Sequence, residues 1–380
     1  MVPRQKKTGA VIAADTGNEM AKDNVALDPN GTTFGLESRS DVRTTILHYL
    51  MYPWLVAGGL NTLSGAGGSR KTMLALYILA QATKGLLQDE NGKPVGPKKV
   101  LYVHQYEDVP EAIIYPRLDM MDADPSRYRL LTMRQRSPID GSLIPAYPPV
   151  EDIKDALKNV VLDWDPDLII IDPIALLIEG DTNSRKDVQP ALVYCNALAQ
   201  AHRPRTILGI HHWNKAGTFS GSQKFEDTAR SFMDIAADPT RPESSIVTIE
   251  KANNNRKRSM RIISATHPYT ADDGGVRNIQ IVERIEDTEL TVDAIRQIRS
   301  SGDDADDVLD QDSWLRDYLM NQGQEGATRK KIIEEGAKNG FSESQLKRAL
   351  GRIGGESQRV KRAAGGCVWV LPQASHISES

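Results

Sequence analysis

The chain has 380 residues, which is long enough to bury a sizeable core and to form two or three domains. Its composition is that of an ordinary folded protein, and a formal net charge of −4 argues against an unspecific coat on DNA. No apolar run reaches the ~18 residues of a membrane span, and the N-terminus lacks the apolar core of a secretory signal. Cys195 and Cys367 lie far apart and form no metal-like cluster. We therefore expect a cytoplasmic protein with reduced thiols and no membrane association.

Residues 1–40 are polar and unpatterned, which predicts a disordered N-terminal tail. From 41 to 285, short apolar runs alternate with segments of helical spacing, which is typical of an α/β fold with a mostly parallel central sheet covered on both faces. The predicted strands are 98–105, 166–172, 205–212 and 244–250, and the predicted helices are 71–83, 150–164 and 187–202. Another segment, 111–121, has helical spacing, but Pro116 should kink or split it.

The C-terminal part reads as a linker and a second, smaller domain. Residues 286–312 carry a run of aspartates and predict a solvated acidic linker. Residues 313–372 follow as a compact module, with a short tail at 373–380. Helices predicted at 312–323, 328–340 and 342–354 precede two short strands within 359–371, which is the winged-helix order. Ser342 and Gln345 have the spacing of a capping box. Between 328 and 362, ten Lys or Arg outnumber four Glu, a local charge of +6.

The segment "SGAGGSRKT" (64–72) is close to the phosphate-binding pattern G-x-x-x-x-G-K-[ST]. A phosphate cradle needs small residues, inward-pointing N–H groups, a lysine for the outer phosphates and a hydroxyl for magnesium. In this loop those positions are Gly65, Ala66, Gly67, Gly68, Ser69, Arg70, Lys71 and Thr72. A short apolar strand precedes the loop and a helix follows it, so the sequence predicts a site for ATP and Mg²⁺. The alternative is a glycine-rich turn that binds nothing.

Arg70 takes the place of the second glycine in that pattern. A side chain there costs little if the backbone is right-handed helical and the side chain points away from the phosphates. On that interpretation Arg70 faces solvent or a neighbouring subunit.

Two strand ends supply carboxylates for the other half of the site. Asp172 ends the strand 166–172, and ligands bind at the carboxyl ends of parallel strands, so Asp172 is placed to hold the metal through water opposite Thr72. Glu107, just beyond 98–105, is expected to orient and deprotonate the attacking water, with Asp108 as a possible substitute. The alternatives are a strand-ending aspartate in a turn and an N-capping acid before the helix at 110.

A third strand ends in His211 and His212, and strand alternation puts one imidazole inward and one outward. A polar side chain at that tip is suited to sense a γ-phosphate and to pass the signal to the next loop. Satisfied surface histidines are the alternative. A zinc site is not expected, because no cysteine or third ligand has a useful spacing.

Six segments in this order resemble RepA-like ATPases of the RecA/DnaB superfamily of ring-forming helicases: 59–76, 100–118, 168–183, 207–217, 220–238 and 249–256. The resemblance spans roughly 45–285, and the C-terminal module is similar to the small helical or winged domain of related phage and plasmid ATPases. It implies a RecA-type P-loop NTPase core and a homo-hexamer with ATP between neighbours. Lys251 or the nearby Arg256 would then reach into the next subunit's site as a charge-stabilising finger.

By motif match, the resemblance gives Lys71 and Thr72 the phosphate and metal roles. Glu107 becomes the general base and Asp172 the metal-side acid. His212 occupies the position of the γ-phosphate sensor. Arg70 departs from the family pattern and puts the catalytic rate in question more than the fold.

In such rings the loops 179–187 and 213–224 face the central channel, where basic groups can grip a phosphate backbone without reading sequence. The third helix of the C-terminal module adds a second basic surface, for which a solubilising face or a protein-docking face is the alternative. The candidate contacts to single-stranded or duplex DNA are Arg185, Lys186, Lys215, Lys224, Lys347, Arg348 and Arg352.

The sequence thus predicts an ATP-hydrolysing, DNA-translocating ring, a plasmid- or phage-type replicative helicase with a replication or recombination partner. Two alternatives stay open. One is an ATPase without unwinding activity, such as a recombination mediator or a helicase loader. The other is a DNA-bound regulator whose nucleotide site only switches its assembly.

Overall fold

The computed structural model describes residues 24–27, 33–35, 38–40, 46–105, 109–212, 222–252, 258–301, 311–312, 314–316, 318–319, 322, 326–359 and 367–371. The chain divides into two compact units, Met1–Leu47 and His48–Ser380. In the first unit, β1 (Asn24–Leu27) pairs antiparallel with β2 (Thr33–Gly35). The expected tail at 1–40 therefore contains a short hairpin-like pair that the polar sequence did not indicate.

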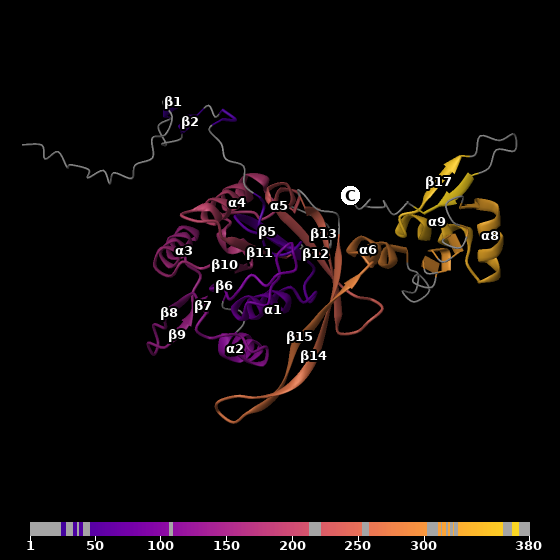
Figure 1. Ribbon diagram of the computed structural model, residues 1–380. Coiled ribbons are helices and arrows are strands. Elements are labelled where there is room, and N and C mark those ends of the chain that lie inside the picture. The colour runs from indigo at the N-terminus through magenta and orange to yellow at the C-terminus, as the bar shows by residue number, and fades with distance from the viewer. Residues whose placement is uncertain are drawn as a thin grey trace, which may run out of the picture. The chain divides into compact units, whose positions relative to one another are not determined.

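A nine-stranded sheet forms the centre of the second unit, in the order β15-β14-β13-β12-β5-β11-β10-β6-β7 (Figure 1). The six strands from β12 to β7 run parallel, whereas β13, β14 and β15 are added antiparallel at one end. This confirms the predicted mostly parallel α/β sheet. The strands are β5 (Gly59–Gly65), β6 (Val100–His104), β7 (Tyr128–Leu131), β10 (Leu168–Asp172), β11 (Thr206–His212), β12 (Ser231–Ala237), β13 (Ser244–Ala252), β14 (Ser259–Thr270) and β15 (Val276–Thr288).

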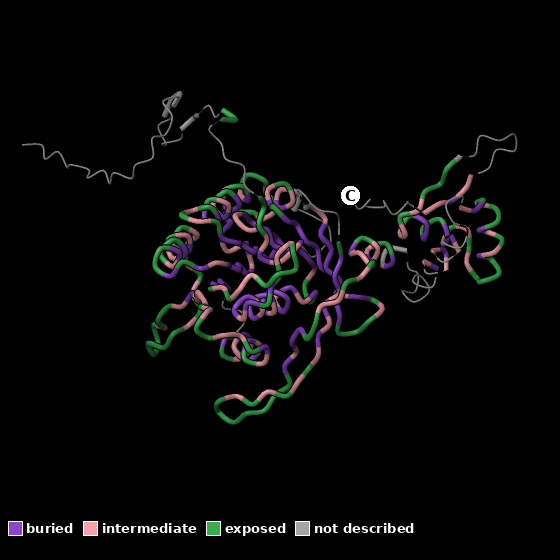
Figure 2. The backbone as a smooth tube through the Cα atoms, in the orientation of Figure 1, coloured by how far each residue is buried: buried purple, intermediate pink, exposed green. Residues whose placement is uncertain are grey.

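Helices cover both faces of the sheet, so its central strands are buried on both sides (Figure 2). On one face lie α1 (Lys71–Lys84) and α2 (Pro110–Met120), and on the other lie α3 (Val150–Trp164), α4 (Arg185–Gln200) and α5 (Ser222–Thr228). Alternate side chains of β10 enter the two cores, Ile170 on the α1 side and Ile169 on the α4 side. This double burial explains why the strands are continuous apolar runs. Short pairs, β3 (Tyr49–Met51) with β4 (Leu55–Val56) and β8 (Arg134–Arg136) with β9 (Leu143–Pro145), lie outside the main sheet.

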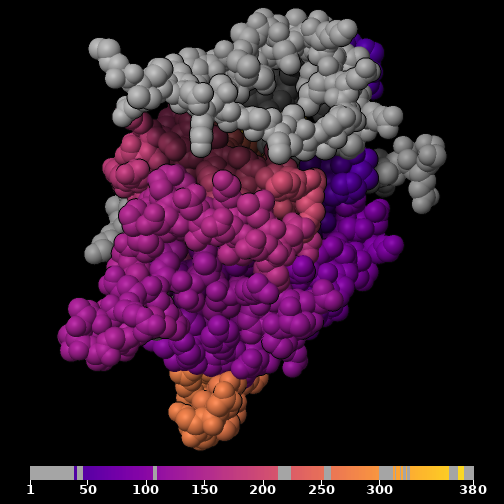
Figure 3. Space-filling model, turned by 90° about the vertical axis from the view of Figure 1, so that its left-hand side faces the viewer, coloured from indigo at the N-terminus to yellow at the C-terminus, as the bar shows by residue number. Residues whose placement is uncertain are grey.

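Helix α2 continues through Pro116, so the expected split does not occur. Proline has no N–H, which leaves the carbonyl of Ala112, four residues earlier, without its helical donor. The guanidinium of Arg277 on β15 donates to that carbonyl. Arg117 on α2 donates in turn to the Gln280 carbonyl at 3.2 Å. The β14–β15 hairpin thus supplies the hydrogen bond that proline removes, while its end projects from the body of the core (Figure 3).

A helix that the sequence did not indicate, α6 (Val292–Ser301), follows β15. Its Val292 and Ile295 are buried against Ala236 and Ile246 of the sheet. Arg296 of the same helix pairs with the buried Asp234 at 2.7 Å. The expected acidic linker 286–312 is therefore wrong in its first half, which belongs to the core, and residues 302–310 lie outside the described part of the chain.

The C-terminal region has a core of its own, which includes Leu315, Ile332, Leu346 and Trp369. Helical residues at 311–312, 314–316 and 318–319 precede the ordered elements β16 (Ala327–Thr328), α8 (Arg329–Lys338), α9 (Glu343–Arg352), β17 (Glu356–Arg359) and β18 (Cys367–Val370). The three strands pair antiparallel in the order β16-β18-β17. The predicted helices at 328–340 and 342–354 and the capping box of α9 are confirmed. The hairpin is confirmed in part, because β17 and β18 pair antiparallel but β17 starts before the predicted residue 359, and the Gly-Gly turn lies outside the described residues. The helix predicted at 312–323 is described only in part, and β16 is an addition.

Both cysteines are free, and burial raises the pKa of the Cys195 thiol to about 12. Within the described residues, the helices are too short or too polar to span a bilayer.

Candidate functional site

The glycine-rich loop joins the buried strand β5 to the start of α1, as its sequence predicted. A β-carbon on Gly65 would lie 2.5 Å from the Ile235 carbonyl oxygen, so the strand end tolerates no side chain there. A β-carbon on Gly67 or Gly68 would have no atom within 4 Å, and both residues are exposed. The middle of the loop is therefore bare backbone beside a helix N-terminus, which is the surface that an anion requires.

Lys71 is buried and folds back over this loop. Its ammonium donates to the carbonyl oxygens of Gly65 at 2.8 Å and Ala66 at 2.7 Å. Burial lowers the pKa of Lys71 to about 8, and the nearby Asp172 carboxylate opposes that shift. A phosphate bound at the loop would therefore lie close to the Lys71 ammonium.

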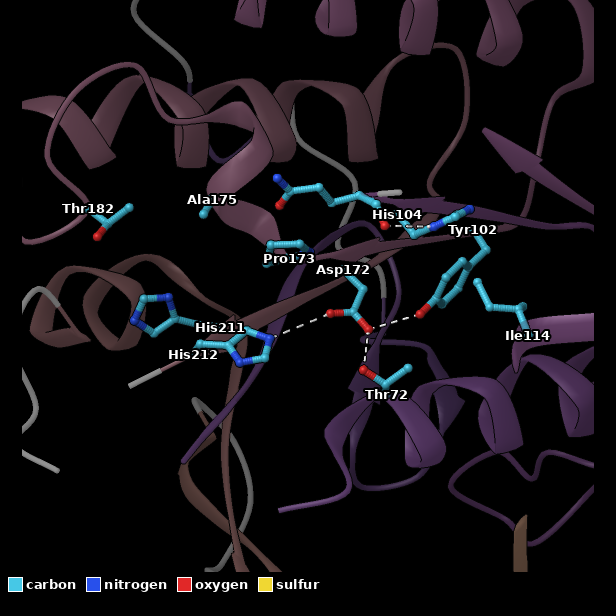
Figure 4. Close-up of a pocket in the computed structure, with 11 residues that line it drawn as sticks. Thr72, Tyr102, His104, Ile114, Asp172, Pro173, Ala175, Thr182, His211 and His212 are labelled. Carbon is cyan, nitrogen blue, oxygen red and sulfur yellow. Dashed lines mark hydrogen bonds and ion pairs between the residues drawn. The ribbon is translucent and has the colours of Figure 1, made fainter. Parts of the chain in front are cut away.

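Asp172 joins three strands into one network (Figure 4). Its Oδ2 accepts a hydrogen bond from Thr72 Oγ1 at 2.7 Å and from the Tyr102 hydroxyl at 2.9 Å, and His212 Nε2 lies 3.9 Å from Oδ1. Burial alone would raise the pKa of Asp172, but the nearby His212 and the hydrogen bonds from Thr72 and Tyr102 outweigh it and hold the pKa below its usual value. The carboxylate is therefore ionised at neutral pH.

The sheet register brings these residues to one edge. Strand β11 lies between β5 and β10, with His212 opposite Gly65, and Asp172 is opposite His104 of β6. A cavity of about 380 Å³ opens there, lined by Thr72, Asp172 and His212 among others. The sequence missed Tyr102, because a tyrosine inside an apolar strand looks like core until its hydroxyl is seen to meet Asp172.

The two histidines have the predicted opposite environments. His211 is buried and stacks on Phe225, with ring centroids 4.3 Å apart. Burial, with smaller effects of His212 and Lys71, lowers the pKa of His211 to about 4. The side chain of His212 is 49% exposed and points to the cavity (Figure 4).

Arg70 differs from the expectation in both backbone and side chain. Its φ of 70° and ψ of 24° are left-handed, so it adopts the conformation for which glycine is favoured. Its side chain is 16% exposed and turns to the start of β13, where it donates to the Ser244 carbonyl at 3.0 Å and to Ser245 Oγ at 3.2 Å. It also pairs with Glu243 at 3.3 Å. The right-handed, outward-facing arginine was therefore a wrong interpretation.

Three predicted residues, Glu107, Lys215 and Arg256, lie outside the described residues. Strand β6 ends at His104, which pairs with Asp172 in the sheet register. Lys251, the other candidate finger, donates to the Glu226 carbonyl at 2.6 Å within its own chain.

The predicted DNA contacts fall into two groups. Arg185 and Lys186 are exposed at the start of α4, and Lys224 is half-buried on α5. On α9, Arg348 is exposed and Lys347 pairs with Glu343 at 2.9 Å.

Arg352 is a correction. Its side chain is 2% exposed and forms a two-pronged ion pair with Asp312, with Nη2 2.7 Å from Oδ1. It is therefore part of the interior of the C-terminal region, and we withdraw it as a DNA contact.

Comparison with known families agrees with this geometry. Residues 31–218 match the family model described as an AAA domain, a stretch that contains the glycine-rich loop, β6, β10 and β11. This match and the mostly parallel sheet fit a P-loop ATPase-like core. A search of curated proteins gives no match.

Thr72, next to the P-loop, and Asp172, at the end of β10, are also suited to bind a magnesium ion. Mg²⁺ prefers oxygen ligands, and here an ionised carboxylate and a hydroxyl, Asp172 and Thr72, lie 2.7 Å apart beside the P-loop. These two residues would hold the metal, directly or through water, next to the phosphates of ATP.

Proposed function

We propose that this protein hydrolyses ATP and uses the reaction to move along DNA as a ring, as a plasmid- or phage-type replicative helicase. The observation that carries the ATPase part is the meeting of Lys71, Thr72 and Asp172 at the carboxyl edge of the sheet. The order of the motifs along the chain, with its resemblance to RepA-like ring ATPases, supports the translocation part.

In this proposal the bare amides of the P-loop bind the β- and γ-phosphates, and Lys71 neutralises them. A bound Mg²⁺ would supply charge compensation on the phosphates, held by Thr72 and Asp172. Glu107 orients the attacking water and accepts its proton. His212, at the tip of β11, contacts the γ-phosphate and links its presence to the loop that follows.

The ring part of the proposal places a neighbouring subunit's Arg256 against the γ-phosphate. Arg185, Lys186, Lys215 and Lys224 would contact the DNA backbone in the channel. A basic surface suits this role because it binds phosphates without reading sequence. Arg348 and Lys347 of the C-terminal region, which we interpret as a winged-helix module, would provide a second DNA contact.

The test is phosphate release with and without single-stranded DNA, for the wild type and for Lys71→Ala. Loss of Lys71 should lower hydrolysis by about 10²–10³-fold, the scale at which removal of one charge-stabilising donor acts. The exposed Lys158 on α3 provides a matched control, and Lys158→Ala should hydrolyse ATP at the wild-type rate. Turnover in Lys71→Ala equal to the wild type would remove the assignment of the site.

A strand-displacement assay tests the helicase part separately. DNA-stimulated turnover with strand separation supports a helicase. DNA-stimulated turnover without separation points to a mediator or loader, and nucleotide binding without turnover points to a nucleotide-switched regulator.

A further inference from the structure

The residue that replaces the P-loop glycine has a partner with the same unusual backbone. Arg70 has φ 70° and Glu243 has φ 64°, and both are left-handed residues with a β-carbon. A β-carbon in this region crowds the neighbouring carbonyl and is unfavourable for every residue except glycine. Two such residues hold each other through the ion pair between Arg70 Nη2 and Glu243 Oε2.

The turn that receives Arg70 is itself firmly held. Ser244 and Ser245 are buried at the start of β13, and they accept two hydrogen bonds from Arg70 Nη1. The Glu243 carbonyl accepts from the Ser264 amide at 2.9 Å and from its hydroxyl at 2.6 Å, which ties the turn to β14. Arg70 is therefore anchored to the sheet, on the side away from the cavity at Asp172.

The backbone at Arg70 sets the geometry of the P-loop. Its carbonyl accepts the first hydrogen bond of α1, from the Leu74 amide at 3.0 Å, and Lys71 and Thr72 follow it directly. A change of φ at residue 70 would turn the amides and side chains of both functional residues.

We propose that Arg70 is a positioning residue: its hydrogen bonds to Glu243, Ser244 and Ser245 hold the P-loop in the left-handed conformation that phosphate binding needs, without contact to the nucleotide. This inference rests on the proposed binding of nucleotide by the P-loop. In the standard pattern, glycine adopts the left-handed conformation without cost because it has no β-carbon. Here the hydrogen bonds of the Arg70 side chain would offset that cost.

The test compares Arg70→Ala with Arg70→Gly in the full chain, because both lack the guanidinium but only alanine keeps the β-carbon. The readout is the Kd of fluorescent (mant) ADP, with KM and kcat for ATP. In Arg70→Ala the loop relaxes away from the left-handed region, so Kd and KM should rise about tenfold with little change in kcat. Arg70→Gly reaches the same conformation freely, and should stay within about threefold of the wild type. Arg70→Lys should fall between them.

Arg241→Ala is the matched control, because Arg241 lies on the same turn but pairs with Glu286 at 3.3 Å. Its Kd should equal that of the wild type. Glu243→Ala should raise Kd in the wild type, by less than Arg70→Ala does, and should have no effect in the Arg70→Gly background. If circular dichroism shows that Arg70→Ala does not fold, the Kd values of Arg70→Lys and Glu243→Ala are compared with that of Arg70→Gly instead.

Equal, large losses of affinity in Arg70→Ala and Arg70→Gly would overturn the inference and indicate direct contact with the nucleotide. Unchanged affinity in both would overturn it as well. A wild-type protein that binds no mant-ADP would contradict the proposed function instead, so the two failures are distinguishable.

Discussion

Neighbouring histidines on one strand show how far burial can separate the chemistry of identical side chains. His211 lies inside the core against Phe225, whereas His212 turns to the cavity near Asp172. The imidazole of His211 is neutral at physiological pH because burial lowers its pKa to about 4. The strand tip therefore carries one buried imidazole that packs on Phe225 at the wall of the cavity and one half-exposed imidazole beside Asp172.

The His211 environment predicts a defined loss of stability in acid. Its pKa is about 4 in the folded chain against 6.5 for the ordinary group, so the unfolded state binds more protons between these values and stability falls as the pH falls. From pH 7.5 to pH 5 this group should remove about 2 kcal/mol from the free energy of unfolding. His211→Phe, which keeps the stacking but cannot titrate, should lose about 2 kcal/mol less over that range in urea unfolding. An unchanged pH dependence would show that His211 is not buried as described.

At this scale the sequence predicted residue types better than residue partners. The loop pattern found Lys71 and Thr72, and the strand end found Asp172, because these positions follow from local motifs. Arg70 and Arg352 were interpreted wrongly because their partners, Glu243 and Asp312, are 173 and 40 residues away in the chain. No local pattern contains such contacts.

Helix α2 shows how one element depends on another for its backbone hydrogen bonds. Pro116 leaves the Ala112 carbonyl unpaired within the helix, and Arg277 of β15 supplies the donor. Arg277→Ala should therefore lower the free energy of unfolding by about 1 kcal/mol.

The same pair allows a double-mutant test. In a Pro116→Ala background the restored N–H at 116 satisfies Ala112, so Arg277→Ala should cost little further stability. Urea unfolding of the four proteins measures the coupling. Equal losses in both backgrounds would show that Arg277 acts by some contact other than this carbonyl.

Elements with a clear sequence pattern, either a continuous apolar run or helical spacing of apolar residues, could be predicted from the sequence. The parallel strands β6, β10 and β11 are continuous apolar runs, and α1, α3 and α4 have clear helical spacing. Strands β14 and β15 mix buried, half-buried and exposed residues without a continuous apolar run, and α6 lies within acidic sequence, so none of the three has a strong local signal. Burial against α2 and against β12 and β13, which only the folded chain provides, decides their structure.

At the scale of the whole molecule, the sheet core and the C-terminal region bury separate sets of apolar side chains. The ion pair of Arg352 with Asp312 lies in the C-terminal region. Burial raises the pKa of Asp312. Arg352→Ala leaves this carboxylate buried without its partner and should destabilise the C-terminal region by about 3 kcal/mol.

Calorimetry of the full chain tests this prediction. The transition of the C-terminal region should move to lower temperature while that of the core stays in place. Lys347→Ala, which removes an exposed ion pair on the same helix, is the control and should change stability by less than about 0.5 kcal/mol. A shift of the core transition in Arg352→Ala would show that the two regions unfold as one.

The way Lys71 rests on Gly65 and Ala66 makes ligand entry an exchange of partners. An incoming anion has to replace two peptide dipoles that already solvate the ammonium, so a single small anion gains little from that cation alone. A ligand with several phosphates would compensate for the lost carbonyl contacts, because it would also contact the loop amides and Thr72. In the proposed function, this exchange would favour a polyphosphate such as ATP over a single phosphate.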